Sequence, residues 1–165
     1  TFPKKDMAEA ARLAEAPDVF YTRGRAVPWF NAALRPLRMK ASVFLREFAD
    51  FLEIEKKHFS KDMNSDIITE LQCDFVALKY REKKLQKEYD TAQDLIRLNG
   101  ALGKFTGEGV ESTVPLHYHP DDLMSEYASD IVFFSKNCRP YRNRTKVFGN
   151  NGSADWRVEK GNSRN

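Results

Sequence analysis

Two histidines and two aspartates lie within seven residues, in the stretch Leu116-His117-Tyr118-His119-Pro120-Asp121-Asp122. A His-x-His pair can chelate zinc, and a nearby aspartate can supply a third ligand. A zinc site usually needs a fourth group, however, and no cysteine or further histidine lies nearby in the sequence. Proline followed by two acidic residues is instead typical of the first turn of a helix. We therefore interpret this stretch as a helix start and predict no metal site.

Two further patterns suggest chemistry but are incomplete. The segment 100–107, GALGKFTG, resembles a phosphate-binding loop in composition, but Leu98 stands where the first glycine belongs and Phe105 follows the lysine instead of Ser or Thr. Cys73 and His58 could form a nucleophile–base pair, yet Cys73 belongs to a periodic apolar segment, where a buried, inert thiol is more usual. The sequence therefore predicts no catalytic residue, no cofactor and no small-molecule substrate.

The composition is that of one folded domain. The 165 residues are 41% hydrophobic and 31% charged, which suits a modest core and argues against disorder. No apolar run approaches the ~20 residues that a membrane-spanning helix needs. The chain begins at Thr1 without a signal-like apolar segment, so we expect a processed mature chain or a fragment. Two glycosylation sequons, Asn143-Arg144-Thr145 and Asn151-Gly152-Ser153, leave a secreted protein as an alternative.

Positive charge gathers at the C-terminal end. The net charge of +3 is too small to imply nucleic acid by itself, but from Arg139 onward seven Lys or Arg residues face only Asp155 and Glu159. Three aromatic residues are interleaved with them: Tyr141, Phe148 and Trp156. Such a segment could stack on RNA bases, lie in an acidic protein groove or bind anionic lipid head groups. Because the charge is modest and the aromatic residues are spread out, we favour a protein surface and predict no nucleic-acid partner.

The element expected to organise the chain is one long helix over residues 64–100. Its apolar residues are spaced by fours and threes and form one stripe, which only Glu82 interrupts: Ile67, Leu71, Phe75, Leu78, Leu85, Tyr89, Ala92 and Ile96. Asn64 or Ser65 can cap the start, and Asn99-Gly100 can end the helix.

A second long helix is predicted from Pro28 to about Ser60. Its stripe has the same spacing and consists of Phe30, Leu34, Leu37, Ala41, Phe44, Phe48 and Phe51, with a kink or break expected at Pro36. A connection as short as residues 61–64 makes two such helices pack antiparallel. The predicted packing seam of this hairpin consists of Phe44, Phe48, Phe51, Leu71, Phe75 and Leu78.

The remaining segments complete an all-α prediction. A short helix is expected over residues 4–16, a glycine-rich loop over 100–115, and a third helix from Pro120 through Phe134. The predicted fold is thus a long antiparallel helical hairpin with an additional C-terminal helix and extended termini. We divide the chain into a short helix and linker (1–27), a helical domain (28–138) and a basic extended tail (139–165).

Several of these segments resemble, in their order, the PDSW-type accessory subunits of mitochondrial complex I, the proton-pumping NADH:ubiquinone oxidoreductase. The matching pieces are Leu45-Arg46-Glu47-Phe48, then Asp66-Ile67, then Asp74, Glu82, Tyr89, Gln93 and Ile96 of the central helix, and finally Phe133-Phe134-Ser135 with Cys138. They cover about half of the chain. Animal members of the family carry several more cysteines, including a pair between the central and the last helix, where this sequence has its glycine-rich segment.

The resemblance implies a non-catalytic structural subunit of the respiratory chain. Such a subunit lies on the intermembrane-space face of the mitochondrial inner membrane, peripheral to the bilayer, and braces the membrane arm against other subunits. The alternative is a helical accessory subunit of mitochondrial ATP synthase or of a mitochondrial ribosome. In the oxidising intermembrane space, Cys73 and Cys138 become a candidate disulfide, with each other or with another chain, although a buried, free Cys73 is the favoured state.

Overall fold

The computed structural model describes residues 4–23, 25–56 and 64–159. Its α-helices are α1 (Lys4–Pro17), α2 (Phe30–Leu34), α3 (Ala41–Lys56), α4 (Ser65–Glu82), α5 (Gln86–Glu108), α6 (Pro120–Leu123) and α7 (Ile131–Asn137). Shorter helical turns are η1 (Asp18–Arg23), η2 (Arg35–Leu37) and η3 (Glu126–Ser129). The strands are β1 (Ser112–Leu116), β2 (Asn143–Asn150) and β3 (Ser153–Val158).

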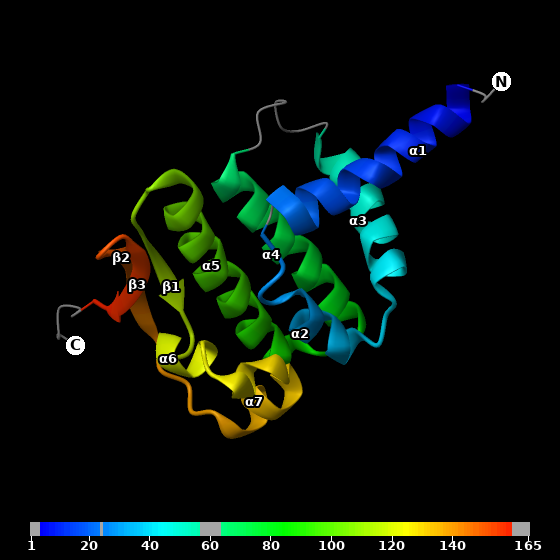
Figure 1. Ribbon diagram of the computed structural model, residues 1–165. Coiled ribbons are helices and arrows are strands. Elements are labelled where there is room, and N and C mark those ends of the chain that lie inside the picture. Colours follow the sequence, from blue (N-terminus) through cyan, green and yellow to red (C-terminus); the bar gives the residue numbers. More distant parts are fainter. Residues whose placement is uncertain (1–3, 24, 57–63, 160–165) are drawn as a thin grey trace.

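Helix α5 lies at the centre of the molecule, between α4 on one side and the three-stranded sheet on the other (Figure 1). Helices α1 and α3 pack together on the far side of α4, and α6 and α7 close one end of α5. The fold is therefore mixed α/β, and the predicted all-α class is wrong. Among the described helices, none is long and apolar enough to cross a membrane.

The single helix predicted over residues 64–100 is instead two helices, α4 and α5, joined by a sharp turn. The amide of Leu85 donates to the carbonyl of Tyr80, and the amide of Lys84 donates to the carbonyl of Arg81. These two bonds, with Lys84 at φ 59°, form a Schellman motif, which ends a helix at a left-handed residue. The turn falls beside Glu82, the one polar residue that interrupts the apolar stripe.

The antiparallel hairpin is therefore formed by α4 and α5, not by residues 28–60 and 65–98 as predicted. The two helices approach closely at Gly100, where a Cβ atom would lie 3.0 Å from the Thr69 hydroxyl oxygen. Gly100 thus serves packing in mid-helix rather than ending the helix. Helix α5 continues to Glu108 and ends at Gly109, whose φ of 69° suits a C-terminal cap.

The predicted second helix breaks at Pro36, as the sequence indicated. Helix α2 gives way to the short turn η2, which contains Pro36, and Arg38 then takes a left-handed φ of 53° before α3 begins. The expected end of the second helix at residues 57–60 and the connection over residues 61–63 lie outside the described residues.

The core is built around an aromatic cluster. Phe20, from the segment expected to be a linker, is fully buried and makes edge-to-face contacts with Trp29, Phe30, Phe44 and Phe48, at centroid distances from 4.7 to 5.8 Å. Edge-to-face pairs of this kind add stability beyond the burial of area. The cluster explains why the α1–η1 segment folds onto α3 and α4.

The predicted seam residues are divided between core and surface. Phe44, Phe48, Leu71 and Phe75 are buried, and the Phe75 ring lies 5.0 Å from that of Phe44 and 5.3 Å from that of Phe48. Phe51 is partly buried against the same cluster, at 5.3 Å from Phe75. Leu78, in contrast, is 37% exposed, because the buried face of α4 runs through Ile68, Val76 and Tyr80 instead.

The expected glycine-rich loop and the expected extended tail both contribute to an antiparallel sheet of order β1-β2-β3. Strands β2 and β3 are joined by Asn151-Gly152, whose φ angles of 52° and 83° are those of a type I′ hairpin turn. Thr145 and Val147 of β2 are buried toward α5, so Arg144 and Lys146, which alternate with them, lie on the outer face. The tail is thus part of the fold up to residue 159.

Candidate functional site

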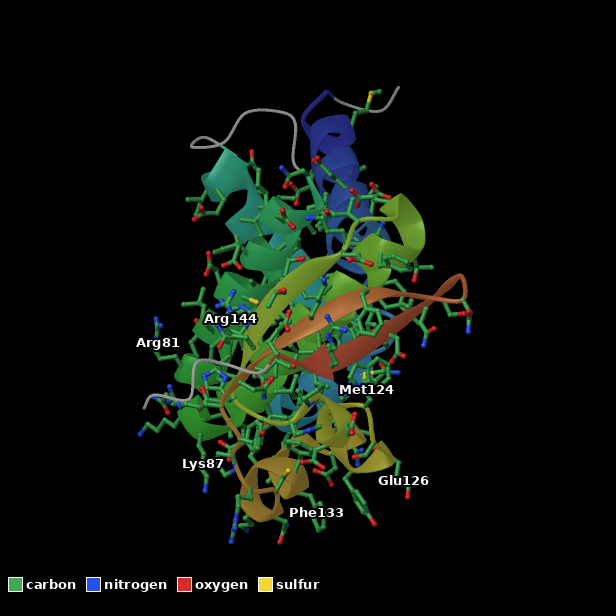
Figure 2. The ribbon with its side chains drawn as sticks, turned by 90° about the vertical axis from the view of Figure 1, so that its left-hand side faces the viewer. Arg81, Lys87, Met124, Glu126, Phe133 and Arg144 are labelled. Carbon is green, nitrogen blue, oxygen red and sulfur yellow. The ribbon has the colours of Figure 1, made fainter. Side chains whose placement is uncertain are left out.

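Four large apolar side chains are exposed on the segment that forms α6, η3 and α7 and their connections. They are Met124, Tyr127, Val132 and Phe133, with exposed fractions between 40% and 61%. We call these four residues the corner patch. Figure 2 shows the three labelled residues along this segment, with Met124 above Glu126 and Phe133 at the lower end. Large apolar side chains exposed as a group, rather than singly, mark interaction surfaces.

Short helical elements hold the corner patch in place. Asp130 caps α7 by accepting from the amide of Phe133 at 3.1 Å, and His119 Nδ1 accepts from the amide of Asp121 at the start of α6. The opposite face of these elements is buried against the core through Leu123, Ala128, Ile131 and Phe134. Because the inward residues anchor each turn, the outward residues between them are fixed at the surface.

A cavity of about 330 Å³ opens beside the corner patch. It is lined by Asp122, Ser125, Tyr127, Phe133, Phe134, Asn137 and Cys138. The rings of Tyr127 and Phe133 stack with their centroids 6.2 Å apart at its edge. A lining of three aromatic rings beside a few polar groups is the usual composition of a binding cavity.

The Cys138 thiol in this cavity is not arranged for catalysis. Its Sγ atom donates to Asp122 Oδ2 at 3.5 Å. Partial burial, followed by the negative charge of Asp122, raises the pKa of the Cys138 thiol to about 11. A thiol must be ionised to act as a nucleophile, so Cys138 is unreactive at neutral pH.

Cys73 and Cys138 are both free thiols. Cys73 is buried inside α4, and burial raises the pKa of its thiol to about 12. The two thiols are not bonded to each other in the structure, and a disulfide of either residue stays a prediction. Cys73 is the inert core thiol that its place in a periodic helix favours. His58, considered as its partner, lies outside the described residues.

A buried carboxylate, Asp94 of α5, organises the histidine stretch. Its Oδ2 atom accepts from the backbone amides of His117 and Tyr118 at 2.8 and 2.9 Å, and its Oδ1 atom lies 2.9 Å from His117 Nδ1. Burial raises the pKa of Asp94 to about 6. Sequence reasoning missed Asp94, because only its position on the buried face of α5 distinguishes it from other helical aspartates.

The arrangement around His117 is structural rather than catalytic. An Asp–His pair is the orienting half of a triad, but His117 Nε2 faces Asp90 at 3.6 Å rather than a hydroxyl or thiol. The other histidine, His119, turns away and its ring packs 5.2 Å from Tyr141. Among the residues that the structure describes, no group of three or more His, Cys, Asp or Glu side chains could hold a metal ion.

The glycines that suggested a phosphate loop lie inside α5 and serve packing. A Cβ atom at Gly103 would lie 2.5 Å from Arg25 Cδ, and one at Gly107 would lie 2.4 Å from Arg25 Nη2. The arginine side chain therefore runs along a groove that only glycines leave open. The packing of Arg25 therefore accounts for the spacing of these two glycines, and no bound nucleotide is needed to explain it.

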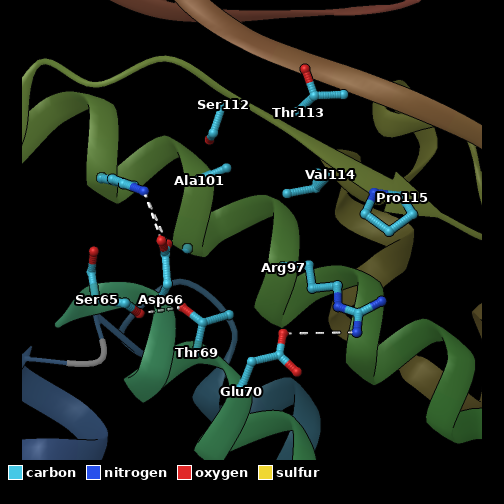
Figure 3. Close-up of a pocket in the computed structure, with 12 residues that line it drawn as sticks. Ser65, Asp66, Thr69, Glu70, Arg97, Ala101, Ser112, Thr113, Val114 and Pro115 are labelled. Carbon is cyan, nitrogen blue, oxygen red and sulfur yellow. Dashed lines mark hydrogen bonds and ion pairs between the residues drawn. The ribbon is translucent and has the colours of Figure 1, made fainter. Parts of the chain in front are cut away.

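A second hollow of about 400 Å³ lies between α4, α5 and β1 (Figure 3). Its two cations are already paired, since Lys104 binds Asp66 at 3.0 Å and Arg97 lies 3.9 Å from Glu70. Neighbouring carboxylates repel an anion, so this hollow is a poor phosphate site. It is lined by polar and small residues, and we assign it no ligand.

Comparison with known proteins gives no match: no family model, no curated protein and no solved structure is similar to this chain.

Proposed function

We propose that the protein is a non-catalytic accessory subunit that binds a partner protein through the corner patch. The observation that carries the proposal is the exposed, stacked pair Tyr127 and Phe133 at the edge of an aromatic-lined cavity, with Met124 and Val132 exposed on the same short helical segment. Burying such side chains in a partner is worth roughly 25 cal/mol for each Å² of apolar surface removed from water. Aromatic residues and methionine are also enriched in protein interfaces.

We propose mitochondrial complex I as the assembly, on the intermembrane-space face of the inner membrane. The support is the resemblance of segments such as Leu45-Arg46-Glu47-Phe48 and Phe133-Phe134-Ser135 to the PDSW-type accessory subunits. The sequence match in the central segment runs from Asp74 to Leu98 without a gap and implies one continuous helix. The break between α4 and α5 therefore weighs against this part of the resemblance. An accessory subunit of ATP synthase or of a mitochondrial ribosome is the second candidate.

Fractionation of native complexes tests the proposal. The tagged chain is expressed in its source cells, and solubilised membranes are separated by native electrophoresis. We expect the tag to co-migrate with NADH dehydrogenase activity, and replacing Tyr127 and Phe133 together by serine to release it to the size of the free chain. The matched control is Val43→Ser, which removes an apolar side chain 43% exposed on α3, and which leaves co-migration unchanged. Co-migration with ATPase activity or ribosomal RNA would favour the second candidate, and migration of the unaltered chain alone would contradict the proposal.

A further inference from the structure

Asparagine precedes glycine at two places in the sequence, Asn99-Gly100 and Asn151-Gly152. Asparagine is a thermolabile residue, because its side-chain amide can be lost as ammonia. The loss begins when the backbone nitrogen of the next residue attacks the side-chain carbonyl carbon. Glycine has no Cβ atom and therefore leaves that nitrogen most accessible. The two dipeptides are chemically alike, so any difference in their reactivity must come from the fold.

The first dipeptide, Asn99-Gly100, is protected inside α5. Asn99 is 8% exposed, and its Nδ2 atom donates to the carbonyl of Leu95 at 2.9 Å. The backbone nitrogen of a residue within a helix, such as Gly100, is engaged in the hydrogen bond to the carbonyl four residues earlier. The Thr69 hydroxyl oxygen also lies 3.0 Å from the place where a Cβ atom of Gly100 would be. The nitrogen can therefore reach the Asn99 side chain only when the helix opens locally.

The second dipeptide, Asn151-Gly152, is open to solvent at the tip of the β2–β3 hairpin. Asn150 pairs with Ser153, so the two residues between them have no partner in the ladder. Both are exposed, and a Cβ atom at Gly152 would meet no described atom within 4 Å beyond its two chain neighbours. Asn150 differs, because its Nδ2 atom donates to Asp155 Oδ2 at 3.1 Å and the residue after it is not glycine.

We propose that Asn151 is a site of spontaneous deamidation in the folded protein. The Gly152 nitrogen loses its proton and bonds to Asn151 Cγ, the bond from Cγ to Nδ2 breaks, and ammonia leaves with that proton. The product is a cyclic imide. Water then opens the imide on either side of the Gly152 nitrogen: cleavage at Cγ gives aspartate, and cleavage at the backbone carbonyl carbon of residue 151 gives isoaspartate. Water enters and ammonia leaves, so the reaction needs no oxidant and no enzyme.

The two products differ in their effect on the hairpin. Aspartate keeps the main chain as it is, and Asp-Gly is favoured in a type I′ turn just as Asn-Gly is, so β2 and β3 stay paired. Isoaspartate instead carries the main chain through the side-chain methylene and lengthens a turn in which residue 151 holds a φ of 52°. Because the turn fixes the register of a hairpin, isoaspartate loosens the pairing of Asn150 with Ser153.

Peptide mass spectrometry of the aged protein tests the proposal, with Asn99 as the matched control in the same molecule. The purified full chain is incubated at neutral pH with and without urea. In the folded chain we expect Asn151 to deamidate at least about a hundredfold faster than Asn99, because a buried helical position reacts only through opening. In urea the protection of Asn99 is lost, and the two dipeptides should react at similar rates.

The variant Asn151→Gly removes the site and keeps the turn, because Gly-Gly is also favoured in a type I′ hairpin. Isoaspartate is detected by an isoaspartate-specific methyltransferase, and hydrogen exchange measures the protection of the β2 and β3 amides. We expect the unaltered chain to gain isoaspartate and lose protection at the hairpin tip as it ages. The variant should show neither change.

A rate at Asn151 no higher than that at Asn99 in the folded chain would overturn the proposal. An Asn151 that stays intact until urea is added would overturn it as well. Aspartate as the sole product, with unchanged hydrogen exchange, would contradict the loosening of the hairpin. The reaction involves no partner, so it goes beyond the proposed function, and native fractionation and deamidation can give independent results.

Discussion

Asp94 shows how a single residue can fix the connection between two layers. It lies on the face of α5 that is turned toward the sheet, and it holds the chain just after β1 through two backbone amides and one imidazole nitrogen. A buried carboxylate is tolerated in a core only when donors surround it, and Asp94 has three. The turn from β1 into α6, and with it the position of the corner patch, depends on this contact.

Removing the carboxylate should destabilise the protein. Asp94→Ala leaves the amides of His117 and Tyr118 without their acceptor, and we expect it to lower the free energy of unfolding by about 2–5 kcal/mol. Asp94→Asn retains an oxygen for both amides, and its NH₂ group can face the imidazole in the other tautomer, so less than half of that loss is expected.

Urea denaturation measures these differences, with Asp90→Ala as the control. Asp90 is 47% exposed and lies 3.6 Å from His117 Nε2, so its removal should cost less than about 1 kcal/mol. Equal losses for Asp94→Ala and Asp90→Ala would show that Asp94 does not hold the turn.

Single residues were predictable where their chemistry is local. The helix start at Pro120 and the cap at Asn64 follow from side chains and backbone within a few residues, and both are present in the structure. Asp94 and Phe20 were not predictable, because Asp94 bonds to groups at least 23 positions away and Phe20 packs on Phe44 and Phe48 of a different helix. Local patterns carry no information about which helix face will be buried by a distant strand.

At the scale of the elements, the turn between α4 and α5 determines the architecture. Lys84 occupies the left-handed position of the Schellman motif, where glycine is usual, so the sequence lacks the customary sign of a helix end. An apolar stripe that continues on both sides of the turn is typical of one long helix as well as of two helices that pack together. Glu82 was the only residue that indicated the break.

The left-handed turn predicts a stabilising substitution. Lys84→Gly removes the Cβ strain at φ 59°, and we expect the free energy of unfolding to rise by about 0.5–1 kcal/mol. Lys83→Gly serves as the control, because Lys83 has an ordinary φ of −95° that carries no strain to relieve. Glycine at position 83 only raises the conformational entropy of the unfolded chain, so it should lower the stability. Thermal unfolding compares the two variants. A loss of stability in Lys84→Gly as large as that in Lys83→Gly would show that the left-handed φ of Lys84 carries no strain.

The strands were harder to predict than the helices, because they are short and the residues that cover their inner face come from α5. The Asn151-Gly152 pair is a strong hairpin signal, and the alternation of Thr145 and Val147 with Arg144 and Lys146 fits a half-buried strand. The basic charge of this segment instead favoured an extended tail. Strand β1, with Pro115 inside it, has no comparable signal of its own.

The whole molecule consists of a packed scaffold and a surface that we propose for binding. The aromatic cluster, the α4–α5 hairpin and the sheet bury the apolar residues that the sequence marks as core. The corner patch is the group of apolar side chains left uncovered at one end (Figure 2). The sequence predicted a non-catalytic protein that binds neighbours, and the fold was needed to choose the residues that we propose for this contact.

Site-specific photocrosslinking tests this central claim most directly. A photoreactive phenylalanine analogue is placed at Tyr127, in the corner patch, or at Val43, the exposed position on α3, and the source cells are irradiated. We expect a crosslink to one defined partner protein from position 127, lost when Phe133 is also changed to serine, and no adduct from position 43. Adducts from position 43 alone, or equal labelling of many proteins from both positions, would contradict the assignment of the corner patch as the docking surface.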